Sequence, residues 1–325
     1  MTIMTIMTKI SCRGVWVVLL GLVPCLMLAQ PVPSQSPTDP VGPMWNMQAL
    51  SQPPKVWPAD ELEHGEKATA APGRSRSTNP ACMPVKRTDW AASSAAVYRA
   101  TNPAAFKKAD QKVVFLGDSI TQLWHTDTVN GWEGGTPVWE KYYAALPAAN
   151  FGIAGDKTEN VLWRITEGGD LDGMAPKVLV LLIGVNNLLP YGGKNSPGQT
   201  AEGITFLVDC LKKKLPETKI LLLGIFPCGE RAEDPMREKI RRTNQSISKL
   251  GDLKQVFYLE IGNRFVEPDG TLTKEKVRDF VHLSEKGYGI WAEAMQPYLV
   301  DLLNNEGKGA IWEELKQKTT PGIVK

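Results

Sequence analysis

The stretch "VLVLLIGVNN" (residues 178–187) opens with seven residues that carry no polar side chain. Polar and apolar residues do not alternate in it, so a strand formed there must be covered on both faces. Four more short runs, rich in apolar residues, have the length of strands: 113–116, 149–152, 220–224 and 256–259. Strands covered on both faces are typical of parallel sheets, in which helices connect one strand to the next.

Helical patterns lie between these runs. Ser196 and Gln199 form a capping box with proline at the first helical position, and apolar residues then recur every three or four positions. Asp234 predicts the start of a second helix, and Ser284 predicts the start of the last one. The alternation predicts an α/β fold, a three-layer α/β/α sandwich with a five-stranded parallel sheet. Functional residues of such sheets lie at the carboxyl ends of the strands.

Ser119 lies where the first of these runs in the chain, 113–116, ends and a helix should begin, within "FLGDSITQLW". A serine at the end of a strand commonly caps the helix that follows. The Gly-Asp-Ser triplet alone therefore does not distinguish a helix cap from a nucleophile, and the decision depends on a partner base.

His282 is the best candidate for that base, because Asp279 lies three residues before it. A carboxylate at this spacing can bond one ring nitrogen, which fixes the tautomer and leaves the other nitrogen to take a proton. His125 has no comparable acid beside it, and His64 lies in a proline-rich segment. The alternative for the Asp279–His282 pair is a surface turn with a local hydrogen bond.

Two further strand ends carry groups that could stabilise an oxyanion. Gly155 precedes a predicted helix whose first amides are free to bind an anion, and Asn186 offers a side-chain amide. Each residue alone is more simply a turn former. Separate strand ends that supply a hydroxyl, two amides and an acid–imidazole pair together favour a catalytic site.

These blocks resemble the SGNH (GDSL-type) hydrolases. They are "GDS" at 117–119, Gly155, "GVNN" at 184–187 and "DFVH" at 279–282. The stretches "NFGIAGDKTENVLWRI" and "HLSEKGYGIWAEAM" are similar to the branch that contains the catalytic subunits of platelet-activating-factor acetylhydrolase and related bacterial secreted esterases. The resemblance covers about residues 110–304 and implies the flavodoxin-like fold of SGNH hydrolases.

The resemblance also implies a role for each residue. Ser119 would be the nucleophile, His282 the general base and acid, and Asp279 the group that orients His282. The oxyanion hole would have three donors, the backbone N–H groups of Ser119 and Gly155 and the side chain of Asn186. Acyl transfer to water by these groups needs no metal ion and no organic cofactor.

The substrate pocket is expected at Ile120, Val281 and Leu188. Ile120 follows the nucleophile and Val281 precedes the base, so branched side chains would crowd the acyl group. We therefore expect an esterase that hydrolyses short-chain O-esters, acetyl esters first. An exported enzyme would meet substrates outside the cell, such as an acetylated carbohydrate.

Two other functions stay open. A lipid-directed esterase, lysophospholipase or thioesterase would act on longer acyl chains, and a non-catalytic module would bind a glycan or a partner. Nucleic acid is not an expected partner, because the 37 basic and 35 acidic residues give a net charge of only +2. The resemblance includes proteins that dimerise, so a homodimer is a further open alternative.

The N-terminal residues predict export. Lys9 and Arg13 precede a short apolar run that ends at Ala29, a pattern typical of a signal peptide over residues 1–29. The run is shorter than the ~20 residues of a membrane span, so we expect a secreted or periplasmic protein with no membrane span after cleavage. An uncleaved membrane anchor is the alternative.

The rest of the chain divides into three predicted parts. Residues 30–97 are rich in Pro, Ser and Ala and predict a linker, in which the apolar residues of 44–58 could dock on the domain. The hydrolase domain is expected over 98–304, followed by a C-terminal tail over 305–325.

Overall fold

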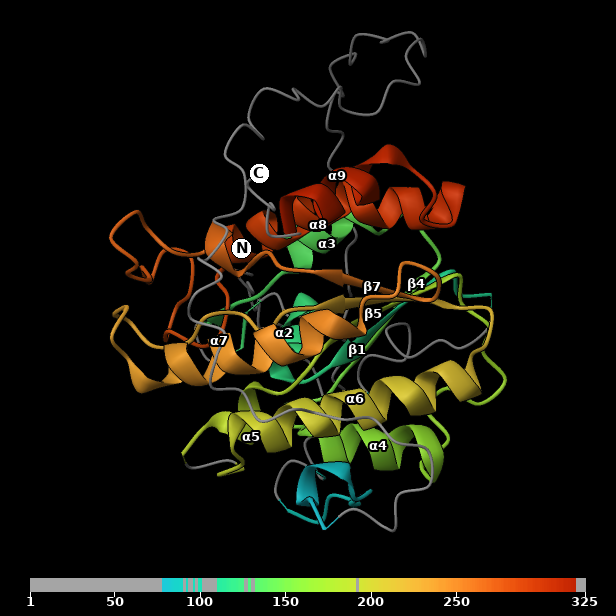
Figure 1. Cartoon of the computed structure of the whole chain (residues 1–325), viewed down its shortest axis with the longest axis horizontal. Coiled ribbons are helices and arrows are strands. Elements are labelled where there is room, and N and C mark those ends of the chain that lie inside the picture. Colours follow the sequence, from blue (N-terminus) through green and yellow to red (C-terminus); the bar gives the residue numbers. More distant parts are fainter. Residues whose placement is uncertain are drawn as a thin grey trace, which may run out of the picture. The chain divides into compact units, whose positions relative to one another are not determined.

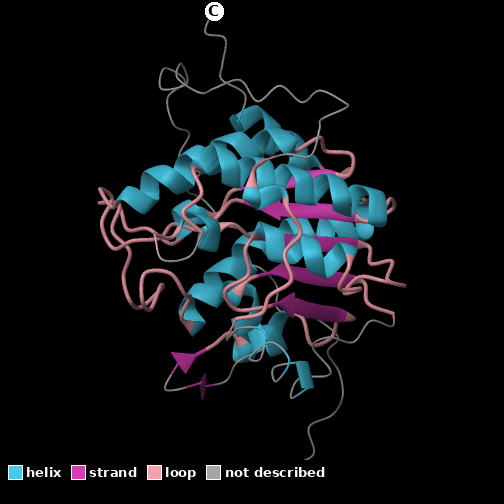
Figure 2. Cartoon of the chain, turned by 90° about the horizontal axis from the view of Figure 1, so that it is seen from below, coloured by secondary structure: helices cyan, strands magenta, loops and turns pink. Residues whose placement is uncertain are grey.

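Five parallel strands form the central sheet of the computed structural model, in the order β4-β1-β5-β6-β7 (Figure 1). The strands are β1 (Val113–Gly117), β4 (Ala148–Gly152), β5 (Val178–Leu182), β6 (Lys219–Leu223) and β7 (Val256–Leu259). Each one overlaps an apolar run of the sequence, so the predicted α/β fold with a five-stranded parallel sheet is confirmed. Figure 2 shows these strands as arrows that point the same way, with the small antiparallel pair β2 (Thr128–Val129) and β3 (Trp132–Glu133) apart from them.

The structure describes residues 78–89, 110–125, 132–190 and 193–319, and positions 92, 96, 99–100 and 128–129 between them. The predicted signal peptide, the apolar segment 44–58 and His64 lie outside the described residues. None of the helices in the described part of the chain is both long enough and apolar enough to cross a membrane.

Helices cover both faces of the sheet (Figure 1). α3 and α8 lie on one side, and α4, α5 and α6 lie on the other. The helices are α2 (Ser119–Gln122), α3 (Thr136–Tyr142), α4 (Thr158–Thr166), α5 (Val185–Leu188), α6 (Pro197–Lys214), α7 (Pro235–Ile247), α8 (Glu285–Asn305) and α9 (Ala310–Thr319). Short 3-10 turns complete the fold at η3 (Pro80–Cys82), η4 (Leu123–His125), η5 (Ser248–Leu250) and η6 (Gly262–Arg264).

The predicted helix starts are confirmed. Ser196 caps α6 and forms a capping box with Gln199, while Asp234 caps α7 and Ser284 caps α8. α8 is not the last helix, however, since α9 follows within the range expected to be a tail. Trp312 of α9 is 1% exposed, and its Nε1 donates a hydrogen bond of 2.9 Å to Asp301 Oδ2 on α8.

An aromatic cluster lies between the sheet and the helices α3 and α8. The Phe115 ring of β1 lies 5.1 Å from the Trp139 ring and 6.4 Å from the Trp291 ring, between ring centroids. The ring of Trp124, in the η4 turn that follows α2, lies 4.9 Å from the Trp291 ring and is fully buried. The cluster therefore fixes α2, and with it the turn that follows β1, against the body of the domain.

Part of the predicted linker packs on the domain. Residues 79–89, which we call the N-terminal strap, lie beside α4 (cyan in Figure 1). Asn79 Nδ2 donates to the backbone oxygen of Gln199 at 2.8 Å, and Thr158 Oγ1 donates to the backbone oxygen of Ala81 at 2.8 Å. The strap is thereby bonded to the first turns of both α6 and α4.

Candidate active site

Ser119 is the first residue of α2 and lies two positions after Gly117, the last residue of β1. The helix cap is its neighbour Asp118, whose Oδ1 accepts a hydrogen bond of 3.0 Å from the Ile120 N–H. The alternative of Ser119 as the cap is therefore wrong, because a carboxylate one residue earlier already takes that role. The Ser119 hydroxyl is left available for other chemistry.

The hydroxyl of Ser119 meets the ring of His282. Ser119 Oγ lies 2.9 Å from His282 Nε2, and His282 Nδ1 lies 2.8 Å from Asp279 Oδ2. Tyr288 of α8 donates a hydrogen bond of 2.7 Å to the Ile120 backbone oxygen, which bonds the helix after His282 to the helix that begins at Ser119. The structure thus joins a hydroxyl, an imidazole and a carboxylate in one hydrogen-bonded chain.

Asp279 is held as a carboxylate. Its Oδ1 accepts from the backbone N–H groups of Val281 at 3.1 Å and His282 at 2.7 Å. Burial acts to raise the pKa of Asp279, but the hydrogen bonds from the His282 ring and backbone outweigh it, and the pKa falls to about 2. The turn is tight: Phe280 has a φ of 63°, which non-glycine residues rarely adopt.

The turn after β4 faces the start of α2. Gly155 occupies its third position with a φ of 74°, and the Asp156 N–H closes the turn on the Ile153 backbone oxygen at 3.2 Å. Gln122 Oε1 of α2 accepts from the Ala154 N–H at 2.7 Å. This bond ties the glycine turn to the helix that carries Ser119.

The three predicted oxyanion donors follow neighbouring strands, because β4 and β5 flank β1 in the sheet. Among the described residues, the backbone N–H groups of Ser119 and Gly155 have no hydrogen-bond acceptor. Asn186 Nδ2 donates to the Asp156 backbone oxygen at 2.9 Å, which leaves its second amide hydrogen for another acceptor. Each of the three groups therefore keeps an N–H that can donate to a further acceptor.

Asp118 is a second carboxyl group near His282, and its role was not anticipated from the sequence. It is 1% exposed, and its Oδ2 has no hydrogen-bond partner within the described part of the chain. Burial raises the pKa of Asp118 to about 7, although the Ile120 N–H and the charge of His282 oppose the shift. The sequence signal that could have pointed to this role is an acidic residue directly after a buried strand.

His125 does not join this site. Its ring packs at 90° to the Trp139 ring with 4.3 Å between centroids, and burial lowers its pKa to about 4. Over the described ranges, no group of three or more His, Cys, Asp or Glu side chains could hold a metal ion.

The residues predicted to line the substrate pocket differ in exposure. Ile120 is 2% exposed and Leu188 is 0% exposed, and both belong to the hydrophobic core. Val281 is half-buried and packs against that core. Of the three, Val281 therefore offers the most surface to a ligand.

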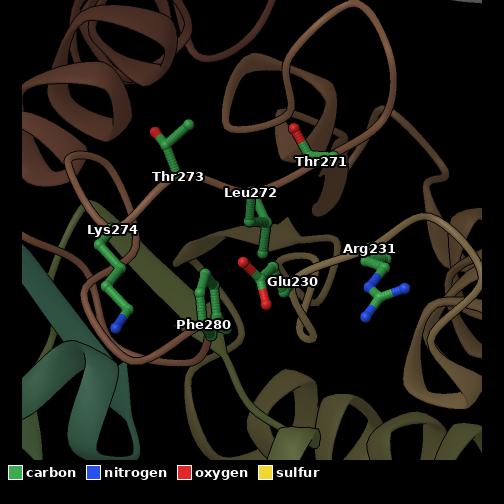
Figure 3. A pocket seen from close by; sticks show the side chains of 7 residues that line it. All are labelled: Glu230, Arg231, Thr271, Leu272, Thr273, Lys274 and Phe280. Atoms are coloured by element: carbon green, nitrogen blue, oxygen red, sulfur yellow. The ribbon is translucent and has the colours of Figure 1, made fainter.

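A pocket of about 510 Å³ lies beside the turn that carries His282 (Figure 3). It is lined by Glu230, Arg231, Thr271, Leu272, Thr273, Lys274 and Phe280. Leu272, Glu230 and Phe280 gather at its centre, while Arg231 and Lys274 lie at opposite sides. The pocket shares only Phe280 with the turn of residues 279–282, so it adjoins the candidate site and is not its centre.

The chain is similar to proteins of known family and known structure. A family model described as GDSL-like Lipase/Acylhydrolase family matches residues 115–290. Platelet-activating factor acetylhydrolase IB subunit alpha1 of Bos taurus is 34% identical over 205 residues, which cover 62% of this chain and 82% of that protein. The alpha2 subunit of Rattus norvegicus is 34% identical over 198 residues, which cover 61% of this chain and 80% of that protein.

A solved structure shows the same fold. It is the crystal structure of a candidate acylhydrolase from Bacteroides fragilis, with a TM-score of 0.52 and 21% identity. The match covers 67% of this chain and 100% of that one.

Proposed function

The chain belongs to the GDSL-like lipase/acylhydrolase family and is a carboxylic ester hydrolase, and from this premise we propose that it is a secreted serine esterase for acetyl and other short-chain O-esters. One observation carries the proposal: Ser119 Oγ, both ring nitrogens of His282 and Asp279 Oδ2 form a single hydrogen-bonded chain with links of 2.9 and 2.8 Å. This is the arrangement that turns a serine hydroxyl into a nucleophile.

In the proposed reaction, His282 Nε2 takes the proton of Ser119 Oγ as the oxygen attacks the ester carbonyl. Asp279 stays ionised, keeps the Nδ1 proton in place and stabilises the imidazolium that forms. His282 then gives the proton to the departing alcohol, which leaves an acyl group on Ser119. A water molecule, deprotonated by His282, attacks this acyl-enzyme and releases the carboxylic acid.

The negative charge that develops on the carbonyl oxygen needs hydrogen-bond donors. The backbone N–H groups of Ser119 and Gly155 and the Asn186 side chain are the proposed three. Two hydrogen bonds hold neighbouring groups in place before substrate arrives: the Ala154 N–H donates to Gln122, and the Asn186 side chain donates to the Asp156 backbone oxygen. Donors that need no reorganisation are the effective kind in this type of catalysis.

The acyl group and the alcohol part of the proposed ester substrate are supported by different observations. The likeness to proteins named acetylhydrolases and the half-buried, branched Val281 beside the base support a small acyl group. The predicted export signal supports an external alcohol part such as a carbohydrate. A platelet-activating-factor-like substrate is the second candidate, favoured by the 34% identity to the IB subunits.

The test is labelling with a fluorophosphonate, followed by hydrolysis of nitrophenyl acetate and octanoate. We expect labelling of the native protein, none of Ser119→Ala, and faster turnover of the acetyl ester. Absence of labelling in the native protein would favour a non-catalytic binding module, and equal rates on both esters would contradict a small acyl site. Acetyl-xylan, phospholipid and acyl-thioester then distinguish a carbohydrate ester, a lipid ester and a thioester as the substrate class. Sequencing the N-terminus of the exported protein tests cleavage after Ala29.

A further inference from the structure

The N-terminal strap reaches the glycine turn through one side chain, Arg87. Its Nη1 donates to the Ala154 backbone oxygen at 3.2 Å and lies 3.4 Å from Asp156 Oδ1. Asp89 holds the other edge of the guanidinium with two bonds, at 3.0 and 2.7 Å. Arg87 is 14% exposed at its side chain, and it lies outside residues 115–290, which match the family model.

The bond from Arg87 acts on the peptide group that carries a proposed oxyanion donor. The Ala154 carbonyl and the Gly155 N–H belong to the same planar trans peptide, so they point in opposite directions. With Arg87 on the carbonyl side, the Gly155 N–H points away from the guanidinium. A hydrogen bond to the carbonyl also polarises the peptide and strengthens its N–H as a donor.

This peptide group needs an external constraint. A positive φ at the third position of a four-residue turn is the type II arrangement, and a type I turn has the central peptide flipped. Glycine tolerates both conformations, so Gly155 by itself does not fix the direction of its N–H. Arg87 packs directly on this residue: a Cβ added to Gly155 would lie 3.0 Å from Arg87 Nη1.

Arg87 contacts the same turn at a second residue, Asp156. The Asp156 carboxylate is buried between Arg164 Nη1 at 2.6 Å and Arg87 Nη1 at 3.4 Å. Its backbone oxygen accepts the hydrogen bond from Asn186 Nδ2. Two of the three proposed donors, Gly155 and Asn186, are therefore oriented by this turn. Arg87 contacts the turn at the Ala154 backbone oxygen and at the Asp156 carboxylate.

We propose that Arg87 is a positioning residue of the oxyanion hole, delivered to the catalytic domain by the N-terminal strap. The inference rests on the proposed esterase function. Arg87 touches no reacting atom in this account; it holds the Ala154–Gly155 peptide in the orientation that presents the Gly155 N–H to the developing oxyanion.

The experiment compares Arg87→Ala, Arg87→Lys and a matched control, Arg99→Ala, in the full chain with a nitrophenyl acetate substrate. Arg99 also pairs with a buried carboxylate, Asp170 at 2.7 Å, and Asp170 in turn contacts Arg164. For Arg87→Ala we expect kcat to fall about 10- to 100-fold with KM little changed, since the loss is confined to the transition state. Arg87→Lys keeps a donor and should recover part of kcat.

A second readout separates positioning from mere stability. A trifluoromethyl ketone forms a tetrahedral adduct whose oxygen occupies the oxyanion hole, so its affinity should fall in Arg87→Ala by a factor similar to kcat. Arg87→Ala and Asn186→Ala should also combine less than additively. Arg99→Ala should lower the melting temperature and leave kcat and inhibitor affinity unchanged.

Two results would overturn the inference. If Arg87→Ala lowers only the melting temperature, as Arg99→Ala does, the residue is structural while the esterase function stands. If the native protein hydrolyses no ester and takes no fluorophosphonate, the proposed function fails and this role for Arg87 fails with it.

Discussion

At the scale of single residues, two carboxyl groups near His282 lie in opposite environments. Asp279 accepts three hydrogen bonds and its pKa is lowered to about 2, whereas Asp118 has one oxygen without a partner among the described residues and its pKa is raised to about 7. Environments that separate the pKa values of two acids also separate their roles. Asp279 is suited to stabilise an imidazolium, and Asp118 is suited to cap α2.

Asp118 should make stability depend on pH. Its folded-state pKa lies above the ordinary value of 3.8, so its contribution to stability is complete below about pH 4 and is lost as pH rises through about 7. Asp118→Asn keeps an acceptor for the Ile120 N–H but cannot ionise. We expect its unfolding free energy, relative to the native chain, to rise by about 2–3 kcal/mol between pH 5 and pH 8.

Urea unfolding of both proteins at several pH values measures this difference. Asp118→Ala removes the helix cap and should be less stable than Asp118→Asn throughout. A difference between Asp118→Asn and the native chain that stays constant with pH would show that the native carboxyl does not titrate in this range.

Asn186 should contribute to turnover and little to folding. Asn186→Ala removes one oxyanion donor, so kcat on an acetyl ester should fall about 10²- to 10³-fold while KM stays close to the native value. Circular dichroism and the melting temperature check that the variant is folded. Turnover within a few-fold of the native rate would remove the Asn186 side chain from the proposed mechanism.

At the scale of elements, the contact between the strap and α6 depends on a helical glycine. A Cβ at Gly203 would lie 2.7 Å from the Ala81 backbone oxygen and 2.8 Å from the Ala81 side chain. Glycine inside a helix costs about 1 kcal/mol relative to alanine. Its presence in the middle of α6 is explained by the close approach of the strap.

Gly203→Ala should therefore destabilise the protein although alanine is the better helix former. The matched control is Gly289→Ala in α8, where an added Cβ meets no atom within 4 Å. We expect Gly289→Ala to stabilise by about 0.5–1 kcal/mol and Gly203→Ala to lower the unfolding free energy. If both substitutions raise the free energy of unfolding in urea by the same amount, the strap does not pack closely enough on α6 to exclude a Cβ at position 203.

At the scale of the whole described domain, segments outside residues 98–304 complete the fold. The strap binds α4 and α6, and α9 buries Trp312 against Phe257 and Tyr298 with ring centroids 4.8 and 5.0 Å away. A chain trimmed to 98–304 loses both. It also exposes the buried carboxylate of Asp301, which accepts from the Trp312 indole.

Trp312→Ala in the full chain measures how much the packing of α9 contributes to stability. Removing a fully buried tryptophan typically costs about 3–5 kcal/mol, so the melting temperature should fall sharply. Trp312→Phe keeps an aromatic ring and should lie between the alanine variant and the native chain. A loss below about 1 kcal/mol for Trp312→Ala would show that α9 adds little to the domain.

The local features of the catalytic domain could be predicted from the sequence because each depends on near neighbours in the chain. Apolar runs marked the five strands, and Ser196, Asp234 and Ser284 marked helix starts. The strap could not be recognised, since Arg87 lies in a polar, proline-containing segment whose contacts are with residues about 70 positions away. α9 was not predicted, although Ile311, Trp312 and Leu315 all pack on the core, because three apolar residues in a short polar segment are a weak helical signal.

The sequence by itself determined the strand–helix alternation and the polar groups that follow each strand, because side-chain periodicity and capping are local properties. Only the tertiary structure decided which of those groups meet. The order β4-β1-β5 makes neighbours of Gly155, Ser119 and Asn186, whereas His282 comes from the loop after β7 at the far edge of the sheet. The hydrogen bond from Tyr288 to the Ile120 backbone oxygen holds the helix after that loop beside the helix of Ser119. The two residues are 168 positions apart, so this contact depends on tertiary packing rather than on local sequence.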